Sequence, residues 1–378
     1  MQHNNQLKTI IIDIAPPWLS PEELDHRMSE LESLVSTYWG VTIVKRVQKK
    51  VTPDYRTFIG SGKLDEIMNI GAELGAELLI IGNIMKPAQV YNVNEHLRVA
   101  GSKIQAWDRV DLILKIFALH AVSPESQLQI ELAAIKHMWP RIYGMGMELS
   151  RQGGGSKNAK WQWETNTEIM KRHLKEKERI ILEKLKTYER TRALHRDNRK
   201  RNNLKTVGIV GYTNAGKSSL FNTLTKKWVL AEDKLFATLG TSVGKVWIEN
   251  PSEDIAIKNG IEILLNDTIW FIRDLPPDLI AAFTSTLEDS IESDILLHVI
   301  DAGDPWCDEK ITIVDDTLRE IDATQPRLYV FNKIDTINTE KLGELREKYS
   351  HLNPIFLSAH TGVWIEELKE ILRDKLFS

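Results

Sequence analysis

The stretch that most constrains the fold of this chain is residues 208–221, which read Gly-Ile-Val-Gly-Tyr-Thr-Asn-Ala-Gly-Lys-Ser-Ser-Leu-Phe. It contains the pattern G-x-x-x-x-G-K-[ST], with a β-rich run before it and a helix start after it. Strand, glycine loop and helix are the context that a phosphate-binding loop needs. Glycines let successive N–H groups curl toward phosphate oxygens, and the helix N-terminus adds the positive end of its dipole.

We therefore predict that this loop holds the phosphates of a nucleotide. Lys217 would reach the β- and γ-phosphates, and the Ser218 hydroxyl would be a ligand of Mg²⁺. The loop residues that we assign to the site are Gly211, Tyr212, Thr213, Asn214, Ala215, Gly216, Lys217 and Ser218.

An acid at the end of a downstream strand fits the same site. Asp267 follows the apolar run 263–266, and a carboxylate at that position can hold Mg²⁺ through water. By itself this acid is a weak signal, and its place two strands after the glycine loop gives it meaning.

Two further motifs indicate that the base is guanine. Asn332-Lys333-Ile334-Asp335 follows the strand 328–331 and has the N-K-x-D pattern of GTPases. The Asp335 carboxylate can accept both N–H groups that guanine presents and adenine lacks, so an adenine would leave it unpaired. Asn332 would brace the loops, and the stem of Lys333 would lie on the base. Ser358-Ala359-His360 follows the last strand and has the S-A-x pattern, in which the Ala359 N–H can meet guanine O6.

Composition narrows the remaining classes. The 378 residues suggest two or three domains, and a net charge of −4 from 49 basic and 53 acidic residues confines any nucleic-acid contact to a local patch. Cys307 is the single cysteine, which excludes a disulfide and a thiolate metal cage. We see neither a signal peptide nor an apolar run of membrane-spanning length, so we expect a cytoplasmic protein, and we expect a monomer.

Strands alternate with helices over residues 1–120, which predicts an N-terminal parallel α/β domain. The expected strands cover 8–15, 41–47, 57–60, 77–82 and 103–107, and the expected helices begin at Pro21, Gly62 and Pro87. Gly60-Ser61-Gly62-Lys63 is too short for a phosphate loop, and we interpret it as an ordinary strand-to-helix turn.

Residues 121–204 are predicted to form a helical linker. A helical apolar pattern covers 111–139, a basic glycine-rich loop covers 141–162, and a long polar helix covers 163–203. A narrow apolar seam predicts that this helix pairs with 124–139 as a hairpin. The end of the long helix is dense in basic residues, namely Arg190, Arg192, Arg196, Arg199, Lys200 and Arg201. Such an end is either a solvated surface or a contact with a phosphate backbone.

Residues 205–378 alternate strand and helix again, as expected for a P-loop GTPase domain with a doubly wound sheet. We place its strands at 206–210, 245–249, 261–266, 295–300, 327–331 and 354–357.

The chain resembles the HflX family of the Obg/HflX-like, ribosome-associated GTPases. The phosphate loop, Leu235-Phe236-Ala237-Thr238-Leu239, Phe271–Pro276 and Leu297–Ala302 carry the likeness, which extends upstream through Phe58–Lys63, Gln129–Ala133 and Leu149–Gly155. The resemblance implies slow GTP hydrolysis, binding to the large ribosomal subunit and GTP-linked splitting or rescue of ribosomes. It also implies that the glycine-rich linker loop approaches ribosomal RNA.

By the same resemblance, two switch segments join the nucleotide site. The first contains Phe236, Ala237, Thr238, Leu239 and Gly240, of which Thr238 would be a second Mg²⁺ ligand. The second is Asp267-Thr268-Ile269-Trp270, where the family has D-T-x-G.

Trp270 departs from the family at the residue whose N–H normally meets the γ-phosphate. A positive φ there would cost about 1–2 kcal/mol, and a lost hydrogen bond to a charged group about 1.5–3 kcal/mol. Together they disfavour the closed switch by roughly 10²- to 10³-fold. The alternative to a working GTPase is therefore a degenerate module that binds guanine nucleotide and hydrolyses little. The linker loop also diverges, with Ser156–Trp163 in place of the family's glycine- and proline-containing tip.

Overall fold

The computed structural model describes residues 6–121, 123–137, 157–201, 204–225, 242–248, 260–267, 271–274, 276, 279 and 292–377. Within the long helix 157–201, side chains are described for 168, 169, 171–194 and 201. The chain divides into two compact units, Met1–Leu119 with Gln127–Leu185 and His120–Ser126 with Lys186–Ser378. Among the described helices, none has the length and apolar character required to span a membrane.

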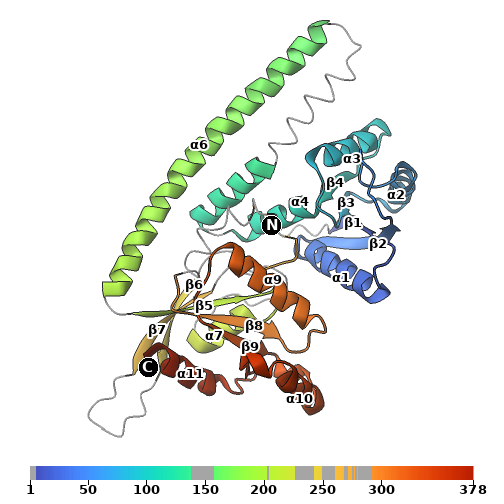
Figure 1. Cartoon of the computed structure of the whole chain (residues 1–378). Coiled ribbons are helices and arrows are strands. Elements are labelled where there is room, and N and C mark those ends of the chain that lie inside the picture. Colours follow the sequence, from blue (N-terminus) through green and yellow to red (C-terminus); the bar gives the residue numbers. More distant parts are fainter. Residues whose placement is uncertain are drawn as a thin grey trace, which may run out of the picture. The chain divides into compact units, whose positions relative to one another are not determined.

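The first unit contains a four-stranded parallel sheet in the order β2-β1-β3-β4 (Figure 1). Its strands are β1 (Leu7–Ala15), β2 (Gly40–Lys49), β3 (Leu78–Ile81) and β4 (Gln105–Asp108). The central strands β1 and β3 are apolar runs with buried side chains on both faces, as a covered parallel sheet requires. The predicted parallel α/β domain is confirmed.

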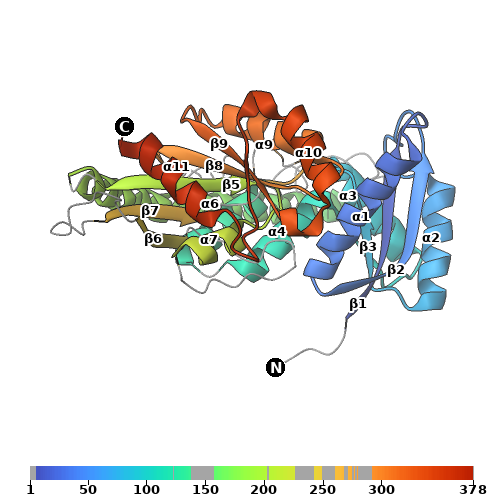
Figure 2. The same ribbon diagram turned by 90° about the horizontal axis from the view of Figure 1, so that it is seen from below.

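Helices cover both faces of this sheet. On one face, α2 (Ser61–Leu74) and α3 (Pro87–Val99) bury Leu64, Ile67 and Val93 against Ile10 and Ile12 of β1. On the other face lies α1 (Pro21–Thr37) (Figure 2). This helix begins with the expected Ser20 cap, in which the Glu23 N–H donates to Ser20 Oγ at 3.1 Å.

Two predictions for this region were wrong. Residues 57–60 form no strand; Asp54 and Phe58 make a single bridge, and Gly60 is the cap of α2. The helical pattern 111–139 is interrupted, because α4 (Arg109–His120) ends before a second helix over 124–137. Ser123 starts that helix by accepting the Ser126 N–H at 3.0 Å. An apolar period continues across such a break because both helices bury one face.

The predicted helical hairpin is confirmed by its packing. Leu132 and Ile135 of the 124–137 helix form a buried cluster with Leu174 and Ile181 of α6 (Lys157–Arg201). Lys177 of α6 also pairs with Glu131 at 2.5 Å. The long helix begins at Lys157 rather than at residue 163, so residues 157–162 are helical and not part of a loop.

The second unit contains a six-stranded sheet in the order β10-β9-β8-β5-β7-β6. The strands are β5 (Lys205–Gly211), β6 (Ser242–Ile248), β7 (Ile261–Asp267), β8 (Ile295–Asp301), β9 (Arg327–Asn332) and β10 (Ile355–Phe356). All neighbours pair in parallel except β6, which runs antiparallel to β7 at the edge. All six strands fall where the sequence predicted them, within three residues.

Helices pack on both faces of the second sheet, as a doubly wound fold requires. Phe221 of α7 (Lys217–Thr225) and Leu368 of α11 (Ile365–Phe377) join one buried cluster. Ile311 of α9 (Cys307–Glu320) and Leu345 of α10 (Thr339–Lys348) join another. This arrangement leaves the carboxyl ends of β5, β8 and β9 side by side, where a ligand site is expected in such a sheet.

Candidate nucleotide site

The loop between β5 and α7 has backbone angles that its glycines make possible. Gly211 has φ 151°, and a Cβ there would lie 2.3 Å from the carbonyl oxygen of Val299. Gly216 has φ 88°, and a Cβ there would lie 2.2 Å from Asn332 Nδ2. Only glycine fits both positions, and Asn214 at φ 60° is a residue type that tolerates this region.

Lys217 lies buried inside this loop. Its ammonium donates to the carbonyl oxygens of Gly211 at 2.9 Å and Tyr212 at 2.6 Å. Burial lowers the pKa of Lys217 to about 7; Asp267 opposes this shift and Lys333 adds to it. A buried ammonium group with two carbonyl partners is stabilised further when an anion enters the loop.

Ser218 and Asp267 meet beside Lys217. The Ser218 hydroxyl, in the first turn of α7, donates to Asp267 Oδ2 at 3.2 Å, and both residues are buried. A hydroxyl and a carboxylate at the end of β7 are oxygen donors of the kind that Mg²⁺ prefers.

Asn332 at the end of β9 links the phosphate loop to the S-A-x segment. Its Nδ2 donates to the Ala215 carbonyl at 3.0 Å, and its Oδ1 accepts the Ala359 N–H at 2.9 Å. Ser358 Oγ donates to Asp335 Oδ1 at 2.5 Å, so the S-A-x and N-K-x-D segments are joined twice. Asp335 itself is exposed, with one carboxylate oxygen held by Ser358.

Lys333 has a partner that sequence reasoning missed. Its Nζ lies 2.8 Å from Asp301 Oδ2 at the end of β8, while Asp301 Oδ1 accepts the Gly303 N–H at 2.9 Å. Asp301 and Asn332 are paired in the parallel register of β8 and β9. The sequence could have indicated this ion pair, because Asp301 ends the strand before the N-K-x-D strand and the carboxyl ends of neighbouring parallel strands lie side by side.

The structure brings together the phosphate loop, Asp267, the N-K-x-D segment and Ser358-Ala359 at one edge of the sheet. His360 is exposed, and Ile334 is half-buried. The remaining predicted residues lie outside the described residues, namely Phe236, Ala237, Thr238, Leu239, Gly240, Thr268, Ile269 and Trp270.

The basic end of α6 is partly neutralised. Arg192 forms an ion pair with Glu125, and both side chains are largely buried. Arg190 and Arg201 are exposed, whereas the side chains of Arg196, Arg199 and Lys200 are outside the described set, as are residues 141–156 of the predicted glycine-rich loop.

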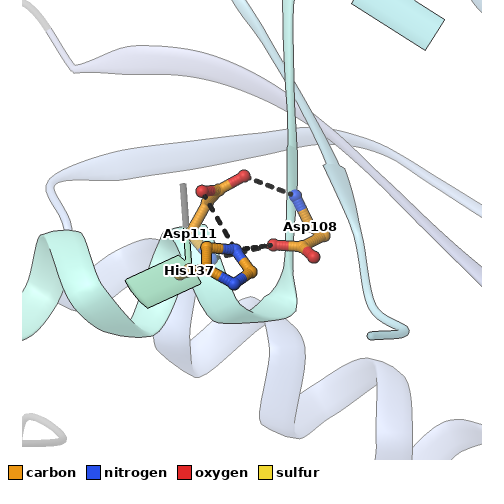
Figure 3. Close-up of side chains that lie close together, drawn as sticks. All are labelled: Asp108, Asp111 and His137. Atoms are coloured by element: carbon orange, nitrogen blue, oxygen red, sulfur yellow. Dashed lines mark hydrogen bonds and ion pairs between the residues drawn. The ribbon is translucent and has the colours of Figure 1, made fainter. Parts of the chain in front are cut away.

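A second polar cluster lies in the first unit, at the start of α4 (Figure 3). Asp108 Oδ1 accepts the Asp111 N–H at 2.9 Å, and Asp111 Oδ2 accepts the Asp108 N–H at 3.4 Å, which together cap the helix. His137 Nε2 lies 3.6 Å from Asp108 and 3.5 Å from Asp111. The helix cap accounts for the position of both carboxylates.

Three protein-family profiles match the chain in succession. They are described as "GTP-binding GTPase N-terminal" over residues 25–118, "GTP-binding GTPase Middle Region" over 120–199 and "50S ribosome-binding GTPase" over 206–333.

Individual proteins match over nearly the whole chain. A protein of Caldanaerobacter subterraneus subsp. tengcongensis named "GTPase HflX" is 40% identical over 359 residues, which are 95% of this chain and 78% of the relative. The "GTPase HflX" of Escherichia coli is 36% identical over 350 residues, 92% of this chain and 79% of the relative. A solved structure titled "crystal structure of SsGBP and GDP complex" is 27% identical, covers 98% of both chains and superimposes with a TM-score of 0.52.

Proposed function

This chain belongs to the HflX family of GTPases, enzymes that bind and hydrolyse GTP, and we propose that in its GTP-bound form it associates with the large ribosomal subunit and couples GTP to the splitting or rescue of ribosomes. We propose further that it acts as a monomer in the cytoplasm, partly bound to ribosomes. We also propose that the domain boundaries lie near residues 120 and 204.

The observation that carries the nucleotide assignment is the bracing by Asn332. One buried side chain bonds the phosphate loop at Ala215 and the S-A-x loop at Ala359. A loop for phosphates and a loop for the base are thus held at a fixed separation before any nucleotide binds, which reduces the ordering cost of binding. Asp335 would read guanine N1–H and N2–H, and the Ala359 region would meet O6.

The donor set beside Lys217 supports a magnesium ion bound with the nucleotide. Ser218 Oγ and Asp267 Oδ2 lie 3.2 Å apart and both offer oxygen, so they fit a hard divalent cation. Ser218 would hold the ion directly and Asp267 through water, with Thr238 as the further ligand. The ion would neutralise charge on the β- and γ-phosphates, while Lys217 binds and orients them.

Exposed basic residues on α6 support the contact with ribosomal RNA. Arg172, Lys175, Lys184, Lys186 and Arg190 are all exposed along this helix. Arg179, in contrast, bonds Glu176 and Glu183 at 2.6 and 2.7 Å, so the middle of the helix is neutral in part. A basic surface of this kind binds phosphate backbones without reading their sequence.

The ribosome assignment is tested by sedimenting the full chain with purified large subunits. We expect co-sedimentation with a non-hydrolysable GTP analogue and much less with GDP. The matched control is Asp335→Asn, because an asparagine can donate to the C2 oxygen of xanthine but leaves guanine N2–H unpaired. This variant should sediment with the xanthosine analogue and not with the guanosine analogue. Absence of the native chain from the subunit fraction under every nucleotide would contradict the proposal.

Trp270 favours a second candidate, in which the chain binds guanine nucleotide and turns it over little. This candidate predicts that Trp270→Gly raises ribosome-stimulated GTP turnover by roughly 10²-fold or more, since glycine adopts a positive φ freely. Turnover by the native chain equal to that of Trp270→Gly, measured with ribosomes present, would eliminate it.

A further inference from the structure

The side chain of Tyr212 contacts Arg273 and Lys310, which lie outside the nucleotide loop that contains it. Tyr212 is the second residue of the G-x-x-x-x-G-K-[ST] pattern, yet it is 5% exposed, and it contacts residues that follow the second switch segment. We propose that Tyr212 is a positioning residue that fastens residues 271–273, which directly follow the second switch segment, to the phosphate loop. The proposal rests on the nucleotide assignment above and adds a role for a residue of that site.

The backbones of the two segments are joined first. Phe271 forms an isolated parallel bridge with Tyr212: the Thr213 N–H donates to the Phe271 carbonyl at 3.1 Å, and the Phe271 N–H donates to the Gly211 carbonyl at 3.4 Å. Phe271 is buried, so this junction is protected from water. The upstream end of the switch is already fixed, because Asp267 pairs with Ile209 in the β5–β7 register. Residues 268–270 therefore connect one point fixed to β5 with another fixed to the loop that follows β5.

The Tyr212 hydroxyl adds a hydrogen bond to the two backbone bonds of the bridge. The Arg273 backbone N–H donates to Tyr212 Oη at 3.0 Å. A buried N–H without an acceptor is costly, so the hydroxyl holds Arg273 two residues beyond the bridge. The sequence gives no hint of this bond, because Tyr212 and Arg273 are 61 residues apart.

Helix α9 supports the same junction from the other side. The Arg273 guanidinium lies 2.9 Å from Glu309 Oε1, and Lys310 Nζ lies 4.9 Å from the centre of the Tyr212 ring. Lys310 is itself paired with Asp304. Glu309 and Lys310 are in the first turn of α9, so one turn of helix contacts both partners of the hydroxyl bond.

We expect the junction to affect the contact between the chain and the γ-phosphate. The residue that faces the γ-phosphate in this family, here Trp270, directly precedes Phe271. Fixing Phe271 and Arg273 limits the positions that the peptide of residue 270 can sample, and such pre-organisation strengthens contacts made only with a triphosphate. The Tyr212 side chain thus contributes to discrimination between GTP and GDP through residues 271–273.

The test uses the full chain with Tyr212→Phe, which removes the hydroxyl and keeps the ring. The matched control is Tyr329→Phe, because Tyr329 Oη also donates one hydrogen bond in the same sheet, to Asp315 at 3.2 Å. Hydrogen exchange is measured without nucleotide and at single-amide resolution. We expect the amides of Thr213 and Phe271, whose own acceptors are unchanged, to exchange roughly 2- to 10-fold faster in Tyr212→Phe only.

Nucleotide titrations give the second measurement. The ratio of the Kd for GDP to the Kd for a non-hydrolysable GTP analogue should fall roughly 2- to 10-fold in Tyr212→Phe and stay at the native value in Tyr329→Phe. Glu309→Gln, which weakens the support of Arg273, should shift both readouts in the same direction.

Three results would overturn the inference. Faster exchange confined to the Arg273 amide would mean that the bond is local and fastens nothing. Faster exchange with an unchanged affinity ratio would remove the positioning role. An equal effect of Tyr329→Phe would show a general loss of stability. A native chain that binds neither nucleotide would defeat the nucleotide assignment, and the exchange data would still decide whether the hydroxyl fastens the two segments.

Discussion

Replacing Asn332 with alanine should damage both the stability and the nucleotide affinity of the second unit. The side chain is 2% exposed and makes two hydrogen bonds, to the Ala215 carbonyl at 3.0 Å and from the Ala359 N–H at 2.9 Å. Each such bond contributes about 0.5–1.5 kcal/mol, so the variant should lose about 1–3 kcal/mol. For a domain of 150–250 residues this corresponds to a fall in Tm of roughly 2–12 °C.

The same change should weaken GDP binding because it releases the two loops from each other. If the whole loss appears in binding, the Kd for GDP rises by roughly 5- to 150-fold. Thermal unfolding of the nucleotide-free chain and a fluorescence titration with labelled GDP measure the two effects separately.

The control is Asn338→Ala, since Asn338 is an asparagine in the same unit whose side chain accepts only a local bond, from the Lys341 N–H at 2.8 Å. Its loss removes a helix cap worth about 1 kcal/mol and should leave the Kd for GDP unchanged. The reasoning is refuted if Asn332→Ala binds GDP as tightly as the native chain and unfolds no earlier than Asn338→Ala.

Three further predictions use other parts of the molecule. Burial lowers the pKa of Lys217 to about 7, so between pH 7 and the usual lysine pKa the unfolded chain binds a proton that the folded chain does not. The free energy of unfolding without nucleotide should therefore rise with pH across this window, by at most about 1.4 kcal/mol per pH unit. Urea titrations of Lys217→Met should lack this rise. Asp301→Ala should raise the Kd for GDP about 2- to 5-fold by releasing Lys333, whereas Asp316→Ala, which breaks an exposed pair with Arg319, should have no effect in the same titration. Asp108→Ala should lower the free energy of unfolding by about 0.5–2 kcal/mol through loss of the α4 cap. Replacement of the exposed Asp25 with alanine should lower it by less than about 0.5 kcal/mol. Equal effects of the two variants would contradict the capping assignment.

The parts of the fold that the sequence predicted are those that a local pattern specifies. Strands β5, β7 and β8 are mostly buried apolar runs, and the Ser20-Pro21 cap starts α1 as expected. A local pattern gave a wrong prediction where the same pattern fits both a strand and a loop. Residues 57–60 look like a strand because Phe58 and Ile59 are apolar, but Ile59 is buried in a loop that leads into α2.

The candidate site divides in the same way. Gly211, Gly216, Lys217 and Ser218 occupy a contiguous motif, and the structure forms the loop that the motif predicts, while their roles with nucleotide remain predictions. The bonds from Asp301 to Lys333 and from Arg273 to Tyr212 join residues far apart in sequence. Spacing carries no period over such distances, so only the register of neighbouring strands brings these residues together.

The pairing order of the two sheets also sets the order in which the chain can fold while it is being synthesised. All four strands of the first sheet have been made once residue 108 has left the peptidyl-transferase centre, so that sheet needs nothing downstream. Strand β5, which carries the phosphate loop, pairs with β8, and the bond between Thr206 and Asp294 spans 88 residues. A nascent chain therefore carries β5 with one edge open until β8 emerges, and unpaired edges of apolar strands invite association with other chains. The nucleotide loop is in this sense a late product of translation, completed well after the N-terminal sheet has closed.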